Sequence, residues 1–218
     1  MKEKTRNILL LITYMAGVLF GTYVSVSLHS AIVVLPLPLR MIAFFADYWL
    51  VFLVLFVFVE FSHERFAFGG FSKEKVPKQI LLGIGAGLAM SLIFTCIPHI
   101  AGFGSFVSGG KEYKFLWQFI YEFVYMTGAV AAVEEMVFRG YFYDRIEKLW
   151  GNSAAVWLSS AMFGIFHIFG GNIIQIFLTF LIGLLFCAMR RIKDFSLLSL
   201  ILMHGVYDAM ISVWDYVF

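Results

Sequence analysis

The chain has 218 residues, of which 61% are hydrophobic and only 14% are charged. A soluble domain averages about 45–50% apolar and about 25% charged residues, so the composition excludes an ordinary soluble domain and predicts a membrane domain. The net charge of +2 gives no indication of a nucleic-acid partner. The length fits one membrane domain, residues 1–218, with N-terminal spans in 1–115 and helices that carry the chemistry in 116–218.

Seven apolar stretches are long enough to cross a bilayer, which requires about 20 residues in a helix. The predicted spans are residues 7–28, 41–61, 79–100, 117 to roughly 148, 153–169, 172–190 and 196–214. The short apolar segment 31–39, which contains Pro36 and Pro38, is interpreted as an interfacial or re-entrant piece, with an eighth span as the alternative. The predicted fold class is therefore all-α, a polytopic bundle of about seven transmembrane helices.

Basic residues favour the cytoplasmic side of a membrane protein. If the N-terminus is cytoplasmic, 13 of the 16 basic residues lie inside and three outside, and the opposite orientation inverts this ratio. The three outside are Arg40, Lys111 and Lys114. We therefore predict a cytoplasmic N-terminus, in the plasma membrane if the source is bacterial.

Three glycines, Gly83, Gly85 and Gly87, form a GxGxG cluster within the third predicted span. A nucleotide-binding fingerprint would need a preceding strand and a βαβ unit, which the sequence does not contain. Small residues at this spacing allow two helices to approach closely, so the cluster predicts tight helix packing.

Ionisable side chains inside spans cost about 2.5–3.5 kcal/mol on insertion scales and are functional candidates by default. Asp47 and Glu122 have no partner at a matched depth and are interpreted as structural or interfacial. A denser set lies in the C-terminal half: Glu134, Glu135, Arg139, His167, His204 and Asp208.

Distances along the predicted helices bring three of these residues to a similar depth. Glu134 lies 17 residues before the turn at Gly151, and His167 lies 16 residues after it. At 1.5 Å per residue, both are roughly 24 Å from the turn, and the same rise places His204 roughly 16 Å from Lys193, the turn before the last helix. We therefore expect the three side chains to meet inside the membrane.

Helical spacing also predicts which side chains share a face. Glu135 and Arg139 are four residues apart, with the acid first, and are expected to form a structural ion pair. Phe163 and His167 have the same spacing, so their side chains should lie on one face.

A carboxylate and two histidines suggest hydrolysis by an activated water molecule. Glu134 is the candidate general base, and His167 is expected to hold the water or shuttle a proton. His204 suits donation to the oxyanion, while Asp208, four residues later, is expected to bond His204 and fix its tautomer. A zinc site with two histidines and Glu134 as ligands is the alternative, although no H-E-x-x-H motif is present and Glu134 would then not serve as the base.

The three motifs, read in order, resemble those of a known family. Residues 134–139 form EExxxR, residues 163–167 form FxxxH, and residues 204–208 form HxxxD in the place of an HxxxN-type motif. In this order and spacing they are similar to the CPBP family of CAAX proteases and bacteriocin-processing enzymes, also called Abi. The resemblance covers roughly residues 128–210 and implies a glutamate-dependent intramembrane endopeptidase that opens to the cytoplasm. No cofactor is expected, and zinc is the alternative.

By the family pattern, Glu134 and His167 would activate water, and His204 with the residue at position 208 would form the oxyanion site. Glu135 and Arg139 would support the motif helix. The departure is Asp208, where eukaryotic-type CAAX enzymes carry Asn or another residue. An ionised Asp cannot donate to an oxyanion, so Asp208 either is protonated or orients His204.

The expected substrate is a hydrophobic or lipidated peptide or protein reached from the bilayer. The alternative function is a non-catalytic membrane protein of the same fold, acting in bacteriocin self-immunity or as the partner of a membrane sensor. A transporter would predict an inverted repeat, which the sequence does not show.

Overall fold

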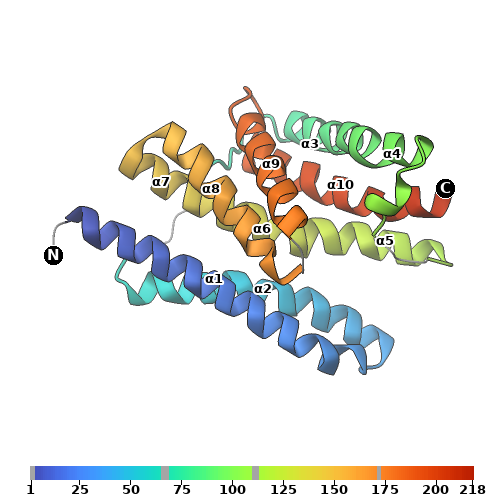
Figure 1. Ribbon diagram of the computed structural model, residues 1–218, viewed down its shortest axis with the longest axis horizontal. Helices are drawn as coiled ribbons and strands as arrows, with labels where there is room; N and C mark the ends of the chain where they lie inside the picture. Colours follow the sequence, from blue (N-terminus) through green and yellow to red (C-terminus); the bar gives the residue numbers. More distant parts are fainter. Residues whose placement is uncertain (1–2, 65–68, 110–112, 171–172) are drawn as a thin grey trace. The chain divides into compact units, whose positions relative to one another are not determined.

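The computed structural model describes residues 3–64, 69–109, 113–170 and 173–218. Across these residues all regular structure is helical and no strand occurs, which confirms the all-α class (Figure 1). Six helical stretches are long and apolar enough to cross a membrane: Glu3–Val33, Leu37–Phe61, Val76–Ile100, Leu116–Trp150, Asn152–Gly170 and Leu197–Val217. The predicted span 172–190 corresponds to a shorter apolar helix, Ile173–Met189. Residue 172, the first of the predicted span, lies outside the described residues.

The ten α-helices of these ranges are α1 Glu3–Val33, α2 Leu37–Phe61, α3 Val76–Ser91, α4 Ile97–Ile100, α5 Leu116–Tyr125, α6 Ala132–Glu135, α7 Tyr143–Trp150, α8 Asn152–Phe166, α9 Ile173–Met189 and α10 Leu197–Val217. Three π-helical segments continue them: η1 Leu92–Cys96, η3 Met126–Ala131 and η4 Met136–Phe142. Two short 3₁₀ turns complete the set: η2 Gly104–Phe106 and η5 His167–Gly170.

The interpretation of residues 31–39 as a separate interfacial piece or an eighth span is wrong. Helix α1 continues to Val33, and α2 already begins at Leu37. Pro36 caps α2, and Pro38 lies in its first turn. Proline is tolerated there because the first amide groups of a helix have no partner within it. The two prolines therefore mark a tight connection between two long helices.

The chain divides into two compact units. Unit 1 comprises Met1–Gly70 and Val133–Met189, and unit 2 comprises Phe71–Ala132 and Arg190–Phe218. The helical run Leu116–Trp150 passes from unit 2 into unit 1 after Ala132. The prediction of one membrane domain, divided after residue 115, stays a prediction, as does the cytoplasmic N-terminus.

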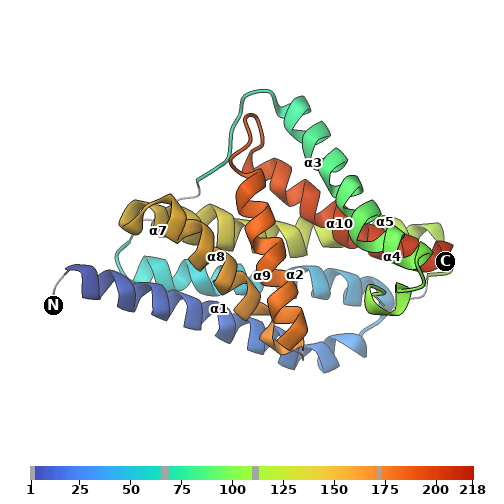
Figure 2. The ribbon, with the colours of Figure 1, turned by 45° about the horizontal axis from the view of Figure 1, so that its top comes forward.

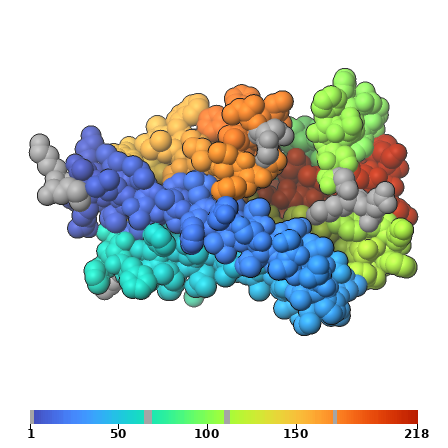
Figure 3. Space-filling model, turned by 60° about the horizontal axis from the view of Figure 1, so that its bottom comes forward, coloured from blue at the N-terminus to red at the C-terminus, as the bar shows by residue number. Residues whose placement is uncertain are grey.

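In unit 1, α1 lies along α2, and α8 lies against α9 (Figures 1 and 2). Glycine permits the close approach of the first pair, because a Cβ on Gly21 would lie 3.1 Å from the Cα of Val51. Helices α1 and α2, blue to cyan in Figure 3, expose large apolar side chains, among them Ile12, Phe20 and Leu53. Hydrocarbon chains rather than water suit such a surface.

A charged cluster ties three helix ends of unit 1 together. The Glu64 carboxylate, just after α2, accepts from Arg6 of α1 at 3.0 Å and from Arg145 of α7 at 3.3 Å. The hydrogen bond from Arg145, supported by Arg6 and opposed by partial burial, lowers the pKa of Glu64. A carboxylate whose pKa is lower in the folded protein than in the unfolded chain stabilises the fold fully at a pH above the unfolded-chain pKa. This stabilisation is lost as the pH falls through the pKa of the folded protein.

We therefore expect the stability of the protein to decline as the pH falls below 4.5, the ordinary pKa of this group. Glu64→Gln should lower stability at neutral pH by up to about 1 kcal/mol, since the cluster is partly exposed to solvent, and should flatten the decline in acid. Unfolding in detergent at a series of pH values measures both effects. Glu60→Gln is the control, because Glu60 is an exposed residue near the same end of α2. An equal effect of Glu60→Gln would show that the Glu64 cluster is not the source of the pH dependence.

In unit 2, α3 packs closely along α10, as the glycine cluster predicted. A Cβ on Gly83 would lie 2.6 Å from the carbonyl oxygen of Ser199, and one on Gly87 would lie 2.6 Å from that of Met203. Gly85, between them, has open space around its missing Cβ. The tight-packing prediction is thus confirmed for Gly83 and Gly87 and does not apply to Gly85.

Gly87→Ala is expected to destabilise the protein by about 1–3 kcal/mol, because the added methyl group collides with backbone that cannot yield easily. Gly85→Ala should leave stability unchanged or raise it, since alanine favours the helix and meets no neighbour. Thermal unfolding of the two variants in one detergent makes the comparison. Equal stability of the two would show that α3 and α10 are not packed as described.

Candidate active site

Glu134 and Glu135 lie in α6, a single α-helical turn between the π segments η3 and η4. A π-helix bonds each amide to the carbonyl five residues earlier instead of four, which widens the turn and occurs frequently at functional sites. The helix continues without a break from Leu116 to Trp150, so the prediction that the fourth span extends through Arg139 is confirmed. The π segments were not predicted.

The predicted ion pair between Glu135 and Arg139 is present and fully buried in unit 1. Arg139 Nη1 donates to Glu135 Oε1 at 3.0 Å, and both side chains are 0% exposed. The guanidinium also lies over the Phe163 ring, 4.1 Å from its centre, and 5.0 Å from the centre of Phe186. Arg139 therefore joins the motif helix to α8 and α9, which fits a supporting role.

Glu134 is only 2% exposed. The hydroxyl of Tyr48, from α2, donates a short hydrogen bond to Glu134 Oε1. This bond holds the carboxylate in place. Sequence reasoning missed Tyr48, because a tyrosine in an apolar span is more often an interfacial residue, and no local spacing connects positions 86 residues apart.

Asp47, next to Tyr48, accepts a hydrogen bond from Ser25 of α1 at 2.6 Å. This bond joins the two helices and fits the structural interpretation of Asp47. In unit 2, burial and a hydrogen bond to Glu122 raise the pKa of Tyr113, so Glu122 also has a local structural partner. Both contacts fit the structural interpretation of Asp47 and Glu122.

His167 ends α8 and begins the 3₁₀ turn η5. Its Nδ1 lies 2.9 Å from the carbonyl oxygen of Phe163. Because a carbonyl only accepts, Nδ1 carries a proton, and in the neutral ring Nε2 is the nitrogen that can accept one. The Phe163 and His167 rings are 4.9 Å apart, which confirms their shared face.

The EExxxR and FxxxH segments pack directly against each other in unit 1. Phe138, one turn after Glu134, meets the rings of Phe163 and Phe166 edge-on, each at 5.3 Å. Both of these rings also contact the imidazole of His167. An aromatic cluster therefore fixes the histidine helix against the glutamate helix.

The third motif lies on α10, in unit 2. His204 Nε2 is 3.2 Å from Asp208 Oδ2, and His204 is 5% exposed, so the expected contact between them is confirmed. A Cβ on the adjacent Gly205 would lie 2.5 Å from the Cα of Thr127 in η3. The glycine thus lets α10 lie directly on the π segment, which fixes the position of His204. The meeting of Glu134, His167 and His204 stays a prediction.

Within the described residues, no three His, Cys, Asp or Glu side chains are grouped so as to hold a metal ion. Two chemistries were expected at this site, a water molecule activated by protein groups and a zinc ion bound by Glu134, His167 and His204. They differ in their response to a chelator, which therefore separates them by experiment.

Comparison with known proteins adds a family to this geometry. Residues 116–210 match the model of a family described as type II CAAX prenyl endopeptidase Rce1-like. The matched segment contains all three motifs, which confirms the resemblance to the CAAX proteases, and together with the six apolar spans it identifies an integral multi-pass membrane protein. No curated protein and no solved structure was found to match.

Proposed function

Since residues 116–210 match the type II CAAX prenyl endopeptidase family, we propose that the chain is an intramembrane endopeptidase. It hydrolyses a peptide bond in a membrane-associated or lipidated peptide or protein, in the plasma membrane if the source is bacterial. The carrying observation is the packing of two motifs in unit 1. Tyr48 holds the buried Glu134 carboxylate one turn before Phe138, whose ring packs against the two rings that contact His167.

In the proposed reaction Glu134 is the general base. Its carboxylate takes a proton from water as the water oxygen attacks the peptide carbonyl carbon, and His167 Nε2 accepts a hydrogen bond from the same water. The tetrahedral intermediate then collapses, the carbon–nitrogen bond breaks, and the proton on Glu134 passes to the leaving amine. Protein groups supply every step, so no cofactor is proposed; zinc remains the competing hypothesis.

His204 is proposed to stabilise the oxyanion, with Asp208 as its positioning residue. Asp208 faces Nε2 of His204, so a bond from His204 to the oxyanion would come from Nδ1. Nε2 then donates to Asp208 while Nδ1 donates to the oxyanion. This arrangement supports an orienting role for Asp208 over direct donation.

The test compares membranes that express wild type or Glu134→Ala, with a chelator added to a further wild-type sample. New peptide termini are identified by mass spectrometry. Products that disappear in the variant and persist with chelator would support the glutamate mechanism and name the substrate. Loss in both samples would favour zinc. Identical termini in all samples, with the host phenotype retained by the variant, would favour the non-catalytic alternative.

Tyr48→Phe removes one hydrogen bond to a charged group. The free energy that such a bond contributes corresponds to a decrease in the cleavage rate of about tenfold. The cleavage rates of one substrate peptide by wild type and Tyr48→Phe in proteoliposomes measure this effect. An unchanged rate would assign Tyr48 to packing alone.

A further inference from the structure

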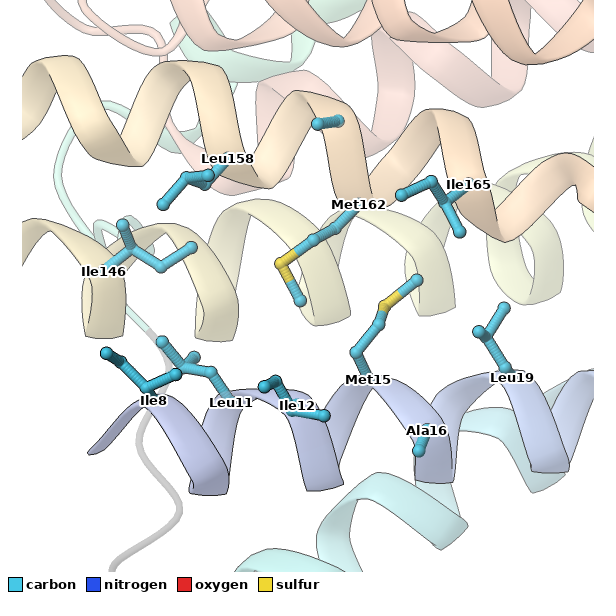
Figure 4. A pocket seen from close by; sticks show the side chains of 11 residues that line it. Ile8, Leu11, Ile12, Met15, Ala16, Leu19, Ile146, Leu158, Met162 and Ile165 are labelled. Carbon is cyan, nitrogen blue, oxygen red and sulfur yellow. The ribbon is translucent and has the colours of Figure 1, made fainter. Parts of the chain in front are cut away.

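Unit 1 contains an apolar groove between α1 and α8, and its lining includes no polar side chain that would select one occupant (Figure 4). Unit 2 presents a charged surface instead, which the proposed chemistry does not use. Five exposed basic side chains lie in two of its segments, residues 71–78, where α3 begins, and residues 191–195, just before α10. These side chains form the basic patch: Lys73, Lys75, Lys78, Arg191 and Lys193.

An acidic side chain joins the two segments of the basic patch. Asp194 lies 3.1 Å from Lys75 Nζ and 2.6 Å from Lys78 Nζ, so the turn before α10 is held against the start of α3 (Figures 1 and 2). Hydrogen bonds from Lys78 and Lys75 lower the pKa of Asp194, which keeps its carboxylate ionised at neutral pH. The cations of both segments therefore gather in one place, although Lys75 and Asp194 are 119 residues apart in the chain.

The basic patch keeps a net positive charge. Glu74 and Asp194 are the only acidic residues in the two segments, so five positive and two negative charges leave a net charge of +3. The side chains of Lys75 and Lys78 remain 54% and 55% exposed in spite of their bonds to Asp194. Helices α3 and α10 also begin here, and the N-terminal end of a helix carries partial positive charge. The surface therefore favours an anionic partner.

The position of the basic patch selects a lipid as that partner. Helices α3 and α10 belong to stretches that are apolar enough to cross a membrane, and both stretches begin at the patch, so its cations lie at the level of the lipid headgroups. Phe71 and Ile192, in the same segments, are 51% and 49% exposed. Cations combined with exposed apolar side chains are typical of segments that lie in the headgroup region of an anionic leaflet. Free phosphate would use the cations but not these apolar side chains.

We propose that the basic patch binds the phosphate groups of anionic phospholipids in the adjacent leaflet. A lipid phosphate between the two segments bridges the start of α3 to the start of α10, and so reinforces the close packing of these two helices. This binding does not depend on the proposed proteolysis.

The test measures the binding of phosphatidylglycerol to the purified protein in a neutral detergent, with phosphatidylcholine of the same acyl chains as the neutral lipid. Each lipid is titrated at low salt, and the rise in unfolding temperature gives its affinity. Wild type should prefer phosphatidylglycerol, and salt at about 1 M, which shortens the Debye length to about 3 Å, should remove most of the preference. Arg191→Gln/Lys193→Gln should weaken phosphatidylglycerol binding by about 30-fold, because each cation near an anionic surface contributes about fivefold.

Two further variants separate the basic patch from charge in general. Lys4→Gln/Lys148→Gln removes the same charge from two exposed positions of unit 1 and should bind phosphatidylglycerol as wild type does. Asp194→Asn changes the charge of the patch in the opposite direction and should strengthen binding by about fivefold. Asparagine tolerates the left-handed conformation that Asp194 adopts, with φ of +68°, so the turn should persist.

Four results would overturn the proposal. The first is wild type that binds the two lipids equally at low salt. The second is a loss of affinity in Lys4→Gln/Lys148→Gln equal to that in Arg191→Gln/Lys193→Gln, which would leave the cations of the patch only their role in orienting the chain. The third is Asp194→Asn that binds phosphatidylglycerol no better than wild type. The fourth is inorganic phosphate that stabilises wild type as much as phosphatidylglycerol does, which would assign the patch to a soluble anion.

Discussion

Replacement of Glu134 with glutamine is expected to lower the rate of peptide hydrolysis by about 10²–10⁴-fold, because the amide cannot accept a proton from water. The fold should persist, since glutamine has the same shape and its carbonyl oxygen can still accept the hydrogen bond from Tyr48. The measurement is the cleavage rate of a substrate peptide in proteoliposomes, together with the unfolding temperature of the same preparation.

Glu122→Gln is the matched control, because Glu122 is also a buried glutamate on the helical run Leu116–Trp150. The same chemical change there should leave the cleavage rate within a small factor of wild type. A Glu134→Gln protein that remains folded and cleaves at the wild-type rate would exclude Glu134 as the base. Equal losses in both variants would show that the effect comes from the helix rather than from the site.

Arg139→Met is expected to destabilise the protein by about 3–5 kcal/mol. The substitution leaves Glu135, which is 0% exposed, without the guanidinium that neutralises it. The buried carboxylate must then take up a proton or draw water into unit 1, and either response costs free energy. Reversible unfolding of the purified protein in mixed micelles measures the difference from wild type.

The double variant Glu135→Gln/Arg139→Met separates the cost of an unpaired charge from the loss of packing. Replacing both partners of a buried pair is often close to neutral, and a methionine can still contact the rings of Phe163 and Phe186. The double variant should therefore recover most of the stability lost by Arg139→Met. A double variant that is less stable than the single one would show that the ion pair is not what Arg139 contributes.

The sequence was sufficient wherever the deciding interactions are local. The spans follow from unbroken apolar stretches, and the pairs Glu135–Arg139 and His204–Asp208 follow from helical spacing. Glycine at positions 83 and 87 predicted close packing because nothing else lets two backbones approach so nearly. The family resemblance followed from the order of the three motifs, since three motifs in a fixed order are far more specific than one motif alone.

The sequence was insufficient where an interaction joins distant segments or changes the backbone. Tyr48 reaches Glu134 from a different helix, and nothing in its neighbours distinguishes it from other tyrosines in apolar spans. The π segments differ from an α-helix only in whether each amide bonds the carbonyl four or five residues earlier, and the pattern of apolar and polar residues does not predict this difference. The connection at Pro36 was misread because apolar residues continue through it.

The wide turn of η4, Met136–Phe142, also determines how the helix would respond to the deletion of one residue. A π turn contains one residue more than the α turn it replaces, and deletion of one residue there would let the helix close into regular α geometry. The turns on either side would keep their rotation about the helix axis, because the extra residue is what distinguishes the wide turn from an α turn, so Glu134 would keep its direction relative to α7. A lineage of such proteins can thus lose one codon in this segment without turning the glutamate away from its neighbours.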